Sequence, residues 1–130
     1  MAAKKMQDFR DLKVWQKAHG LVLEVYLLTD GFPKSEQFGL TSQLRRAAAP
    51  IAANIVEGRG AGSEMLFRRH LRISLASAFE VEYFLVLAGD LKFGTQASIK
   101  NGIVQVAEVR RMLHGLIQSL SASTTKTTHP

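Results

Sequence analysis

The sequence predicts an all-α protein, an antiparallel up-down-up-down bundle of four helices, and three observations support this prediction. Apolar residues recur at helical spacing in four long segments, breaks that contain glycine separate these segments, and none of them has the pattern of a strand. With 130 residues, 46% of them hydrophobic, the chain is long enough for one domain with one core. We expect the bundle to span residues 9–120, between a flexible leader at 1–8 and a disordered, Ser/Thr-rich tail at 121–130.

The first predicted helix spans residues 11–29, with Asp11 as its N-cap. Its apolar residues repeat every three or four positions, which gives the helix one face that can pack in a core. This stripe consists of Val14, Ala18, Leu21, Val25 and Leu28, widened by Trp15, Val22 and Tyr26. Glycine and proline at residues 30–33 end the helix.

The second predicted helix spans residues 36–58. We expect Ser35 to cap a short turn at its start and Thr41 to cap its main part. The alanines in its stripe keep the apolar face thin, so that another helix can approach closely. The stripe consists of Leu40, Leu44, Ala47, Ala48, Ile51 and Ile55. Pro50 lies inside this helix and removes one backbone hydrogen bond, so we expect a kink between Arg46 and Pro50.

Asn54 and Glu57 form a polar motif, because residues three apart lie on the same side of a helix. In the first interpretation the motif is structural: Glu57 pairs with a nearby arginine, and Asn54 bonds to the backbone or to a neighbouring helix. In the second it is a polar functional site at a junction of helices or subunits. We favour the structural interpretation, because a charged group near a core is normally paired.

The third predicted helix spans residues 63–91, with Ser63 as its N-cap. It is the least amphipathic of the four, because apolar residues fall on nearly every side of it. One stripe consists of Leu71, Ala78, Val81, Leu85 and Ala88, and a second of Ile73, Ala76, Phe84 and Leu87. A helix that is apolar nearly all round is buried on more than one side, so we predict that copies of the chain associate through it. The predicted oligomer interface includes Leu75, Phe79, Glu82 and Val86.

The fourth predicted helix spans residues 95–120 and starts at Thr95. Its stripe consists of Ile99, Ile103, Val106, Leu113, Leu116 and Leu120, with Met112 and Ile117 beside it. Arg110 falls on the apolar side of this helix. We expect its long side chain either to reach solvent along the apolar surface or to pair across a subunit boundary.

Several motifs occur in the order that is typical of one protein family. They include residues 9–18 (FRDLKVWQKA), 43–47 (QLRRA) and 54–58 (NIVEG). With them, residues 9–120 resemble the four-helix-bundle proteins encoded in intervening sequences of bacterial 23S rRNA genes. The family proline falls where this chain has Ala52, whereas the proline here is Pro50.

The resemblance implies a ring-shaped homo-oligomer, a homopentamer, and a connection with RNA. The accessory proteins of diversity-generating retroelements are a related group that shares the bundle and works on nucleic acid beside a reverse transcriptase. The homopentamer does not follow from the periodicity of the helices, which predicts only an oligomer.

The charge of the chain favours a polyanionic partner. The net charge is +6, and residues 41–72 hold six arginines against two glutamates. These arginines are the predicted nucleic-acid-binding residues: Arg45, Arg46, Arg59, Arg68, Arg69 and Arg72. Residues 73–91 hold three acids and no basic residue. We expect phosphate contacts to dominate, because Trp15, Tyr26 and most phenylalanines lie in or beside the stripes, and binding to the RNA or DNA backbone should be salt-dependent.

A protein-interaction scaffold with no nucleic-acid role is the alternative, in which the basic residues dock an acidic protein partner or stay solvated.

Catalysis is not expected, because the sequence does not pair a nucleophile with a general base and a residue that orients it. A di-iron bundle needs Glu-x-x-His, which is absent, so we expect neither metal nor cofactor. The glycine run at 58–62 lacks the lysine of a phosphate-binding loop and predicts a plain helix–helix turn. Without cysteine, signal peptide or membrane span, the protein is expected to be cytoplasmic.

Overall fold

The computed structural model describes residues 8–128, and the side chains of residues 8–121. Within this part the chain forms four α-helices and two short 3-10 helices. The α-helices are α1 (Lys13–Thr29), α2 (Leu40–Arg59), α3 (Glu64–Asp90) and α4 (Gln96–Thr128), and the 3-10 helices are η1 (Phe9–Asp11) and η2 (Lys34–Glu36). Residues 1–7 of the predicted leader and 129–130 of the predicted tail lie outside the described residues.

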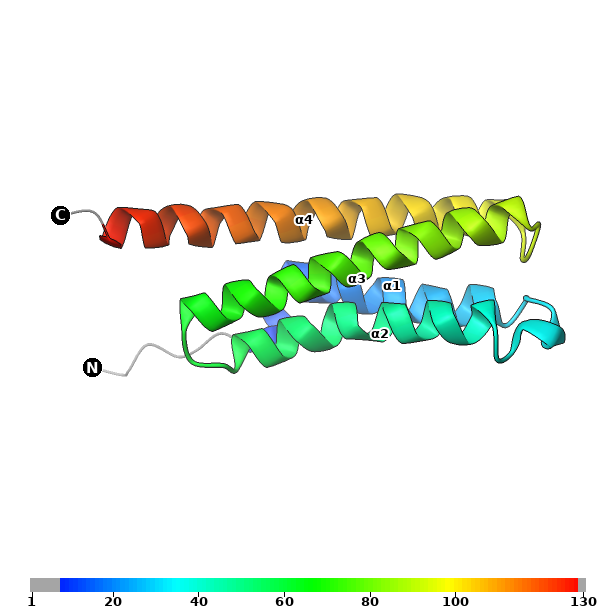
Figure 1. Cartoon of the computed structure of the whole chain (residues 1–130), viewed down its shortest axis with the longest axis horizontal. Helices are drawn as coiled ribbons and strands as arrows, with labels where there is room; N and C mark the ends of the chain where they lie inside the picture. The colour runs from blue at the N-terminus through cyan, green and yellow to red at the C-terminus, as the bar shows by residue number, and fades with distance from the viewer. Residues whose placement is uncertain (1–7, 129–130) are drawn as a thin grey trace.

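The helices pack as a bundle in which each runs opposite to the one before it (Figure 1). The backbone of α2 lies next to those of α1 and α3, and the backbone of α4 next to those of α3 and α1, whereas the backbones of the diagonal pairs lie further apart. The prediction of an all-α four-helix bundle is therefore confirmed. None of the described helices is long and apolar enough to cross a membrane.

Two helices differ from their predicted lengths. Helix α2 begins at Leu40, because η2 and the turn after it occupy residues 34–39. Helix α4 continues past Leu120 to Thr128 and includes most of the segment predicted to be a disordered tail. Ser and Thr are only modestly unfavourable in a helix, and a helix that already exists needs no new nucleus to grow.

The cap predicted at the start of the third helix is confirmed, and Thr95, predicted as the start of the fourth helix, caps that helix. Ser63 Oγ accepts a hydrogen bond from the Leu66 amide at 3.1 Å. In the same way, Thr95 Oγ1 accepts from the Ser98 amide at 3.1 Å. Each side chain satisfies one of the amides that a helix leaves unpaired at its N-terminus.

The caps predicted for the first two helices are wrong, because 3-10 turns precede both. Asp8, not Asp11, is the capping acid: it accepts from the Arg10 amide at 2.8 Å and starts η1, and Leu12 follows as the uncapped N-cap of α1. Neither Ser35 nor Thr41 caps a helix. Instead Glu36 Oε1 reaches forward to the Leu40 amide, at 2.9 Å.

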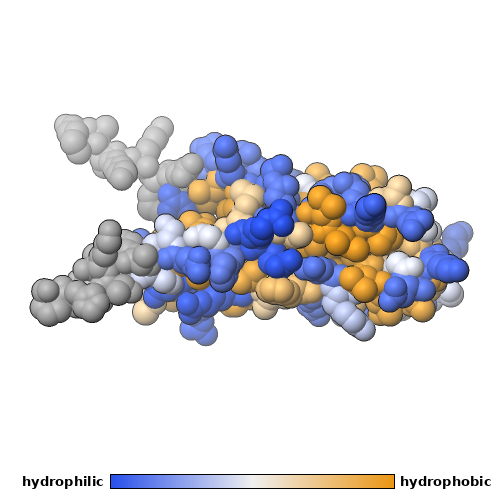
Figure 2. Space-filling view, turned by 90° about the horizontal axis from the view of Figure 1, so that it is seen from above, coloured by the Kyte–Doolittle hydropathy of each residue, from blue (hydrophilic) through white to orange (hydrophobic). Residues whose placement is uncertain are grey.

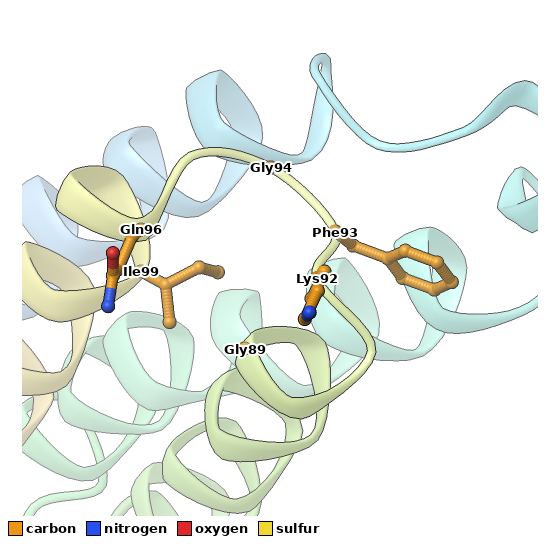
Figure 3. A pocket seen from close by; sticks show the side chains of 6 residues that line it. All are labelled: Gly89, Lys92, Phe93, Gly94, Gln96 and Ile99. Carbon is orange, nitrogen blue, oxygen red and sulfur yellow. The ribbon is translucent and has the colours of Figure 1, made fainter.

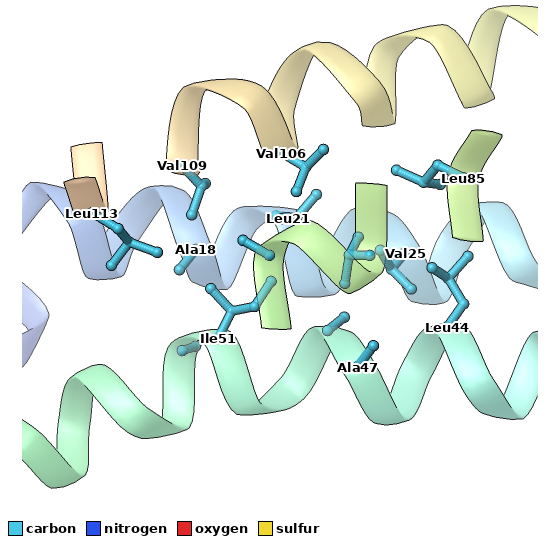
Figure 4. Packing of buried hydrophobic residues seen from close by; sticks show 14 of the residues in the cluster. Ala18, Leu21, Val25, Leu44, Ala47, Ile51, Leu85, Val106, Val109 and Leu113 are labelled. Carbon is cyan, nitrogen blue, oxygen red and sulfur yellow. The ribbon is translucent and has the colours of Figure 1, made fainter. Parts of the chain in front are cut away.

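The core lies along the axis of the bundle (Figure 4). Every residue of the predicted stripes of α1 and α2 is buried, as is the first stripe of α3. The core face of α4 differs from the predicted stripe, because Val109 is buried while Ile103, Leu116 and Leu120 are only half-buried. Gly102 is also buried, and a Cβ there would lie 3.2 Å from a methyl carbon of Leu85. Glycine at this position therefore lets α4 approach α3 closely.

Pro50 lies inside α2 as expected, and the kink stays a prediction. Beside it, Ser74 on α3 is fully buried and donates from Oγ to the Ile51 carbonyl at 2.7 Å. This hydrogen bond satisfies the only polar group that α3 buries completely in its described side chains, and it fixes the register of α3 on α2.

In the turn between α3 and α4, a lysine occupies a left-handed backbone conformation that favours glycine. Lys92 has a φ of 61°. Its amide donates to the Gly89 carbonyl at 3.1 Å and the Phe93 amide to the Ala88 carbonyl at 2.9 Å, which is the arrangement that usually places glycine at the left-handed position. The side chain of Lys92 is exposed.

Replacing Lys92 with glycine should therefore raise the free energy of unfolding by about 0.5–1 kcal/mol, because it relieves a left-handed backbone. Gly94→Ala is the opposite control: Gly94 has a φ of 71°, and a Cβ there would lie 3.2 Å from the Phe32 ring, so the substitution should destabilise. Urea unfolding followed by circular dichroism measures both. Equal changes in the two variants would contradict this interpretation of the turn.

Candidate nucleic-acid interface

The six predicted arginines do not form one patch. Arg59 ends α2, and Arg68, Arg69 and Arg72 lie in the first turns of α3, so the short α2–α3 turn brings these four to one end of the bundle. Arg45 lies near the other end of α2, about 20 Å away along the helix at 1.5 Å per residue. Arg46 is its exposed neighbour.

Arg45 joins the start of α2 to the end of α1. Its Nε donates to Thr29 Oγ1 at 2.8 Å, and its Nη2 donates to Asp30 at 3.0 Å and to the Tyr26 carbonyl at 3.3 Å. The guanidinium also lies 4.6 Å from the centre of the Tyr26 ring. These contacts bind a hydroxyl, a carboxylate and one backbone carbonyl at the end of α1 and give Arg45 a structural role.

The first turns of α3 carry a shallow hollow with cationic edges. It has a volume of about 520 Å³ and is lined by Met65, Arg68, Arg69, Arg72, Ile73 and Ala76. Three of these six residues are arginines and none is acidic. Arg69 and Arg72 are exposed and Arg68 is half-buried. The hollow is therefore a positively charged surface with an apolar floor.

A second hollow follows along the groove between α3 and α4. Its volume is about 450 Å³, and its lining consists of Leu75, Phe79, Arg110, Arg111, His114, Gly115 and Gln118. The sequence analysis did not connect α4 with the basic surface. The basic cluster itself is visible in the sequence, because Arg110, Arg111 and His114 lie within about one helical turn. Its position beside α3, however, depends on how the helices pack.

Arg110 pairs within the chain, and a partner across a subunit boundary stays a prediction. Its Nε donates to Glu82 Oε1 at 3.0 Å, and its guanidinium lies 4.9 Å from the centre of the Phe79 ring. Glu82, predicted to be an interface residue, therefore has its partner on α4 of the same chain.

The polar motif of Asn54 and Glu57 lies between α2 and α3. Asn54 donates to the Pro50 carbonyl at 2.9 Å, and its Oδ1 is 3.1 Å from His70 Nδ1. A carboxylate oxygen of Glu57 lies 4.0 Å from the same nitrogen. Asn54 thus bonds to its own backbone and to a neighbouring helix, as the structural interpretation expects, and a histidine stands beside Glu57.

Two of the other hollows have fewer basic side chains in their linings. One at the opposite end of the bundle, of about 480 Å³, has a single ionisable side chain, Lys92, beside Phe93 and Ile99 (Figure 3). At the α2–α3 turn a hollow of about 210 Å³ holds Arg59 beside the acidic Glu64. Among the described residues, no three or more His, Asp or Glu side chains group closely enough to hold a metal ion.

Exposed apolar residues remain on the surface of the single chain. On α3, Phe79 is 53% and Val86 44% exposed, whereas Leu75 is half-buried against the core. On α1 and α4 the exposed apolar residues include Leu23, Leu27 and Val104. Figure 2 shows hydrophobic surface gathered in the half of its face towards the α3–α4 connection.

Comparison with known proteins gives the family. Residues 10–115 match the family model of the 23S rRNA-intervening sequence protein. The chain belongs to this family. Its structure is similar to that of a protein of unknown function from the S23 ribosomal protein family from Bacteroides thetaiotaomicron, with a TM-score of 0.75 and 26% identity over 80% of this chain and 97% of that one. None of the curated proteins compared with the chain matches it.

Arg45→Ala should lower the free energy of unfolding by about 1–3 kcal/mol, because it removes the partly buried hydrogen bond to Thr29, the contacts with Tyr26 and Asp30, and the packing of the arginine stem. Arg46→Ala is the matched control and should change stability by less than about 0.5 kcal/mol, since Arg46 is exposed. Chemical unfolding of the two variants measures the difference. Losses of the same size would show that the contacts of Arg45 do not stabilise the bundle.

Proposed function

We propose that this protein is a non-enzymatic, basic oligomer that binds the phosphate backbone of nucleic acid through the arginine-rich end of its bundle. The observation that carries the proposal is the clustering of Arg68, Arg69 and Arg72 on the first turns of α3, around a hollow with no acidic lining residue. Arginine binds phosphate through a planar, bidentate set of donors. Arg111, in the neighbouring hollow, extends the same surface onto α4.

The distribution of charge supports a directional attraction. Three of the four acids of α3, Glu80, Glu82 and Asp90, lie in its second half, whereas Glu64 lies in its first turn, before the arginines. Because the net charge is +6, a polyanion is attracted to the whole molecule and oriented towards the basic end. Family membership also supports a nucleic-acid role, since the family is named after the intervening sequences of 23S rRNA, and a similar protein belongs to a ribosomal protein family.

Exposed apolar residues support the oligomeric part of the proposal. Tyr83 and Val86 on α3, and Leu23 and Leu27 on α1, are all 44% or more exposed. A contact between two different surfaces of identical chains is heterologous and closes into a ring when the rotation allows it. The assembly proposed here is the ring-shaped homopentamer that the family resemblance implied.

Replacing Arg68, Arg69 and Arg72 together with glutamine should weaken RNA binding at least about tenfold at low salt and flatten the salt dependence of the affinity, because fewer phosphate contacts release fewer counterions. The matched control replaces Lys34, Lys92 and Lys100, which removes the same charge at the other end of the bundle. Fluorescence anisotropy with a labelled RNA, at several salt concentrations, measures both. Circular dichroism verifies that both variants remain folded.

Two results would contradict the nucleic-acid proposal. If both triple variants lose the same affinity, only net charge matters and the arginine-rich end is not a site. If the unmodified protein binds neither RNA nor DNA at low salt, the scaffold oligomer with no nucleic-acid role replaces it. The segregated charges of α3 are compatible with an acidic protein partner in that case.

Val86→Glu should reduce the native mass measured by light scattering, because it places a charge in an apolar contact between chains. The side chain is 44% exposed in the single chain, so the bundle itself should stay folded. Ala49→Glu, at an exposed position of α2, is the control and should leave the mass unchanged. An unmodified protein with the 14.4 kDa mass of one chain would contradict the oligomer.

A further inference from the structure

The groove between α3 and α4 combines an exposed aromatic ring with cations on both sides. Leu75 and Phe79 form its apolar part on α3, and Arg111 and His114 stand on α4. The arginine-lined hollow of α3 continues from it, because Arg72 and Leu75 are three residues apart on the same helix. The two hollows follow one another along α3, and we call them together the α3–α4 groove.

Phe79 is a half-exposed aromatic residue near the middle of α3. Its side chain is 53% exposed, although the sequence placed most aromatic residues in or beside apolar stripes. One part of the ring is covered by Arg110, whose guanidinium lies 4.9 Å from the ring centre. Glu82 fixes that arginine with a hydrogen bond of 3.0 Å. Arg110 therefore holds the ring in place, while about half of the residue stays exposed.

The arginines near Phe79 have two roles: Arg110 is paired with an acid, whereas Arg72 and Arg111 are available for an anion. Glu82 compensates the charge of Arg110, so Arg110 supports the ring instead of attracting an anion. Arg72 and Arg111 are exposed on either side of the groove. A half-exposed aromatic ring in a groove with an exposed arginine on each of its two helices matches a nucleotide chain whose bases are unstacked, since a base can lie on the ring while the phosphates meet the arginines.

We propose that the α3–α4 groove binds single-stranded nucleic acid, with a base stacked on Phe79 and the neighbouring phosphates on Arg72 and Arg111. This inference rests on the proposed function and names its substrate class. A duplex keeps its base faces stacked inside and offers only its backbone to the arginines, so it cannot use the ring. Phe79 and Leu75, which the sequence placed in an oligomer interface, are then ligand-binding residues, and assembly uses other apolar positions such as Tyr83 and Val86.

The experiment measures the anisotropy of one labelled oligonucleotide of about twenty nucleotides, single-stranded and as a duplex with its complement, at the same salt concentration. The unmodified protein should bind the single strand more tightly. Phe79→Ala should weaken single-strand binding at least about fivefold, and leave duplex affinity and the salt slope unchanged, because the phosphate contacts remain. Phe38→Ala is the matched control: Phe38 is 90% exposed but lies before α2, at the other end of the bundle.

A second variant keeps the test independent of any loss of structure. Phe79→Trp preserves a stacking surface and should retain single-strand affinity, with quenching of the new tryptophan by the bound strand. The difference from the unmodified protein, which has one tryptophan, Trp15, isolates this signal. Fluorescence that stays unchanged on binding would overturn the stacking assignment.

The outcomes separate this inference from the proposed function. If Phe79→Ala binds the single strand as well as the unmodified protein does, while the triple arginine variant still loses affinity, the groove proposal fails and the phosphate-binding proposal stands. If no nucleic acid binds the unmodified protein, both fail. If Phe79→Ala lowers the native mass and leaves single-strand affinity unchanged, Phe79 is an assembly residue and the groove is not the site.

Discussion

Close approach of α2 and α3 determines where the arginines of this protein lie. A Cβ on Gly58 would stand 2.7 Å from the Cβ of His70, so only glycine fits between the two helices at this level. Further along, the buried Ser74 hydroxyl bonds to the Ile51 carbonyl. Because these contacts fix α3 against α2 next to a short turn, the first turns of α3 cannot move apart from the end of α2. The cationic surface is therefore carried by a rigid part of the bundle.

The repeat of apolar residues predicted the fold well, because a whole face of each helix is buried in the core. All residues of the stripes of α1 and α2 are buried, and four helices follow from four stripes. Helix starts were predicted less well, because a cap depends on the turn before it. Glu36 reaches the Leu40 amide only because η2 places it there, and a carboxylate four residues before a helix has no simple sequence signal.

The candidate site was predicted in part for a similar reason. Arg68, Arg69 and Arg72 are neighbours in sequence, so their clustering needs no tertiary information. Arg45 looked equivalent to them, yet its hydrogen bonds to Thr29 and Asp30 exist only because α1 ends beside it. The contribution of α4 was missed because periodicity gives the face of a helix but not the helix that it meets.

The contact between Gly102 and Leu85 has a consequence for how the sequence can change over time. Glycine inside a helix costs about 1 kcal/mol relative to alanine, yet a Cβ at position 102 would lie 3.2 Å from Leu85 and 3.4 Å from Leu28. A smaller residue at position 85 opens space for alanine at 102, and neither change is favourable alone. Positions 85 and 102 should consequently covary among relatives, and such covariation would record the distance between α3 and α4 in each of them.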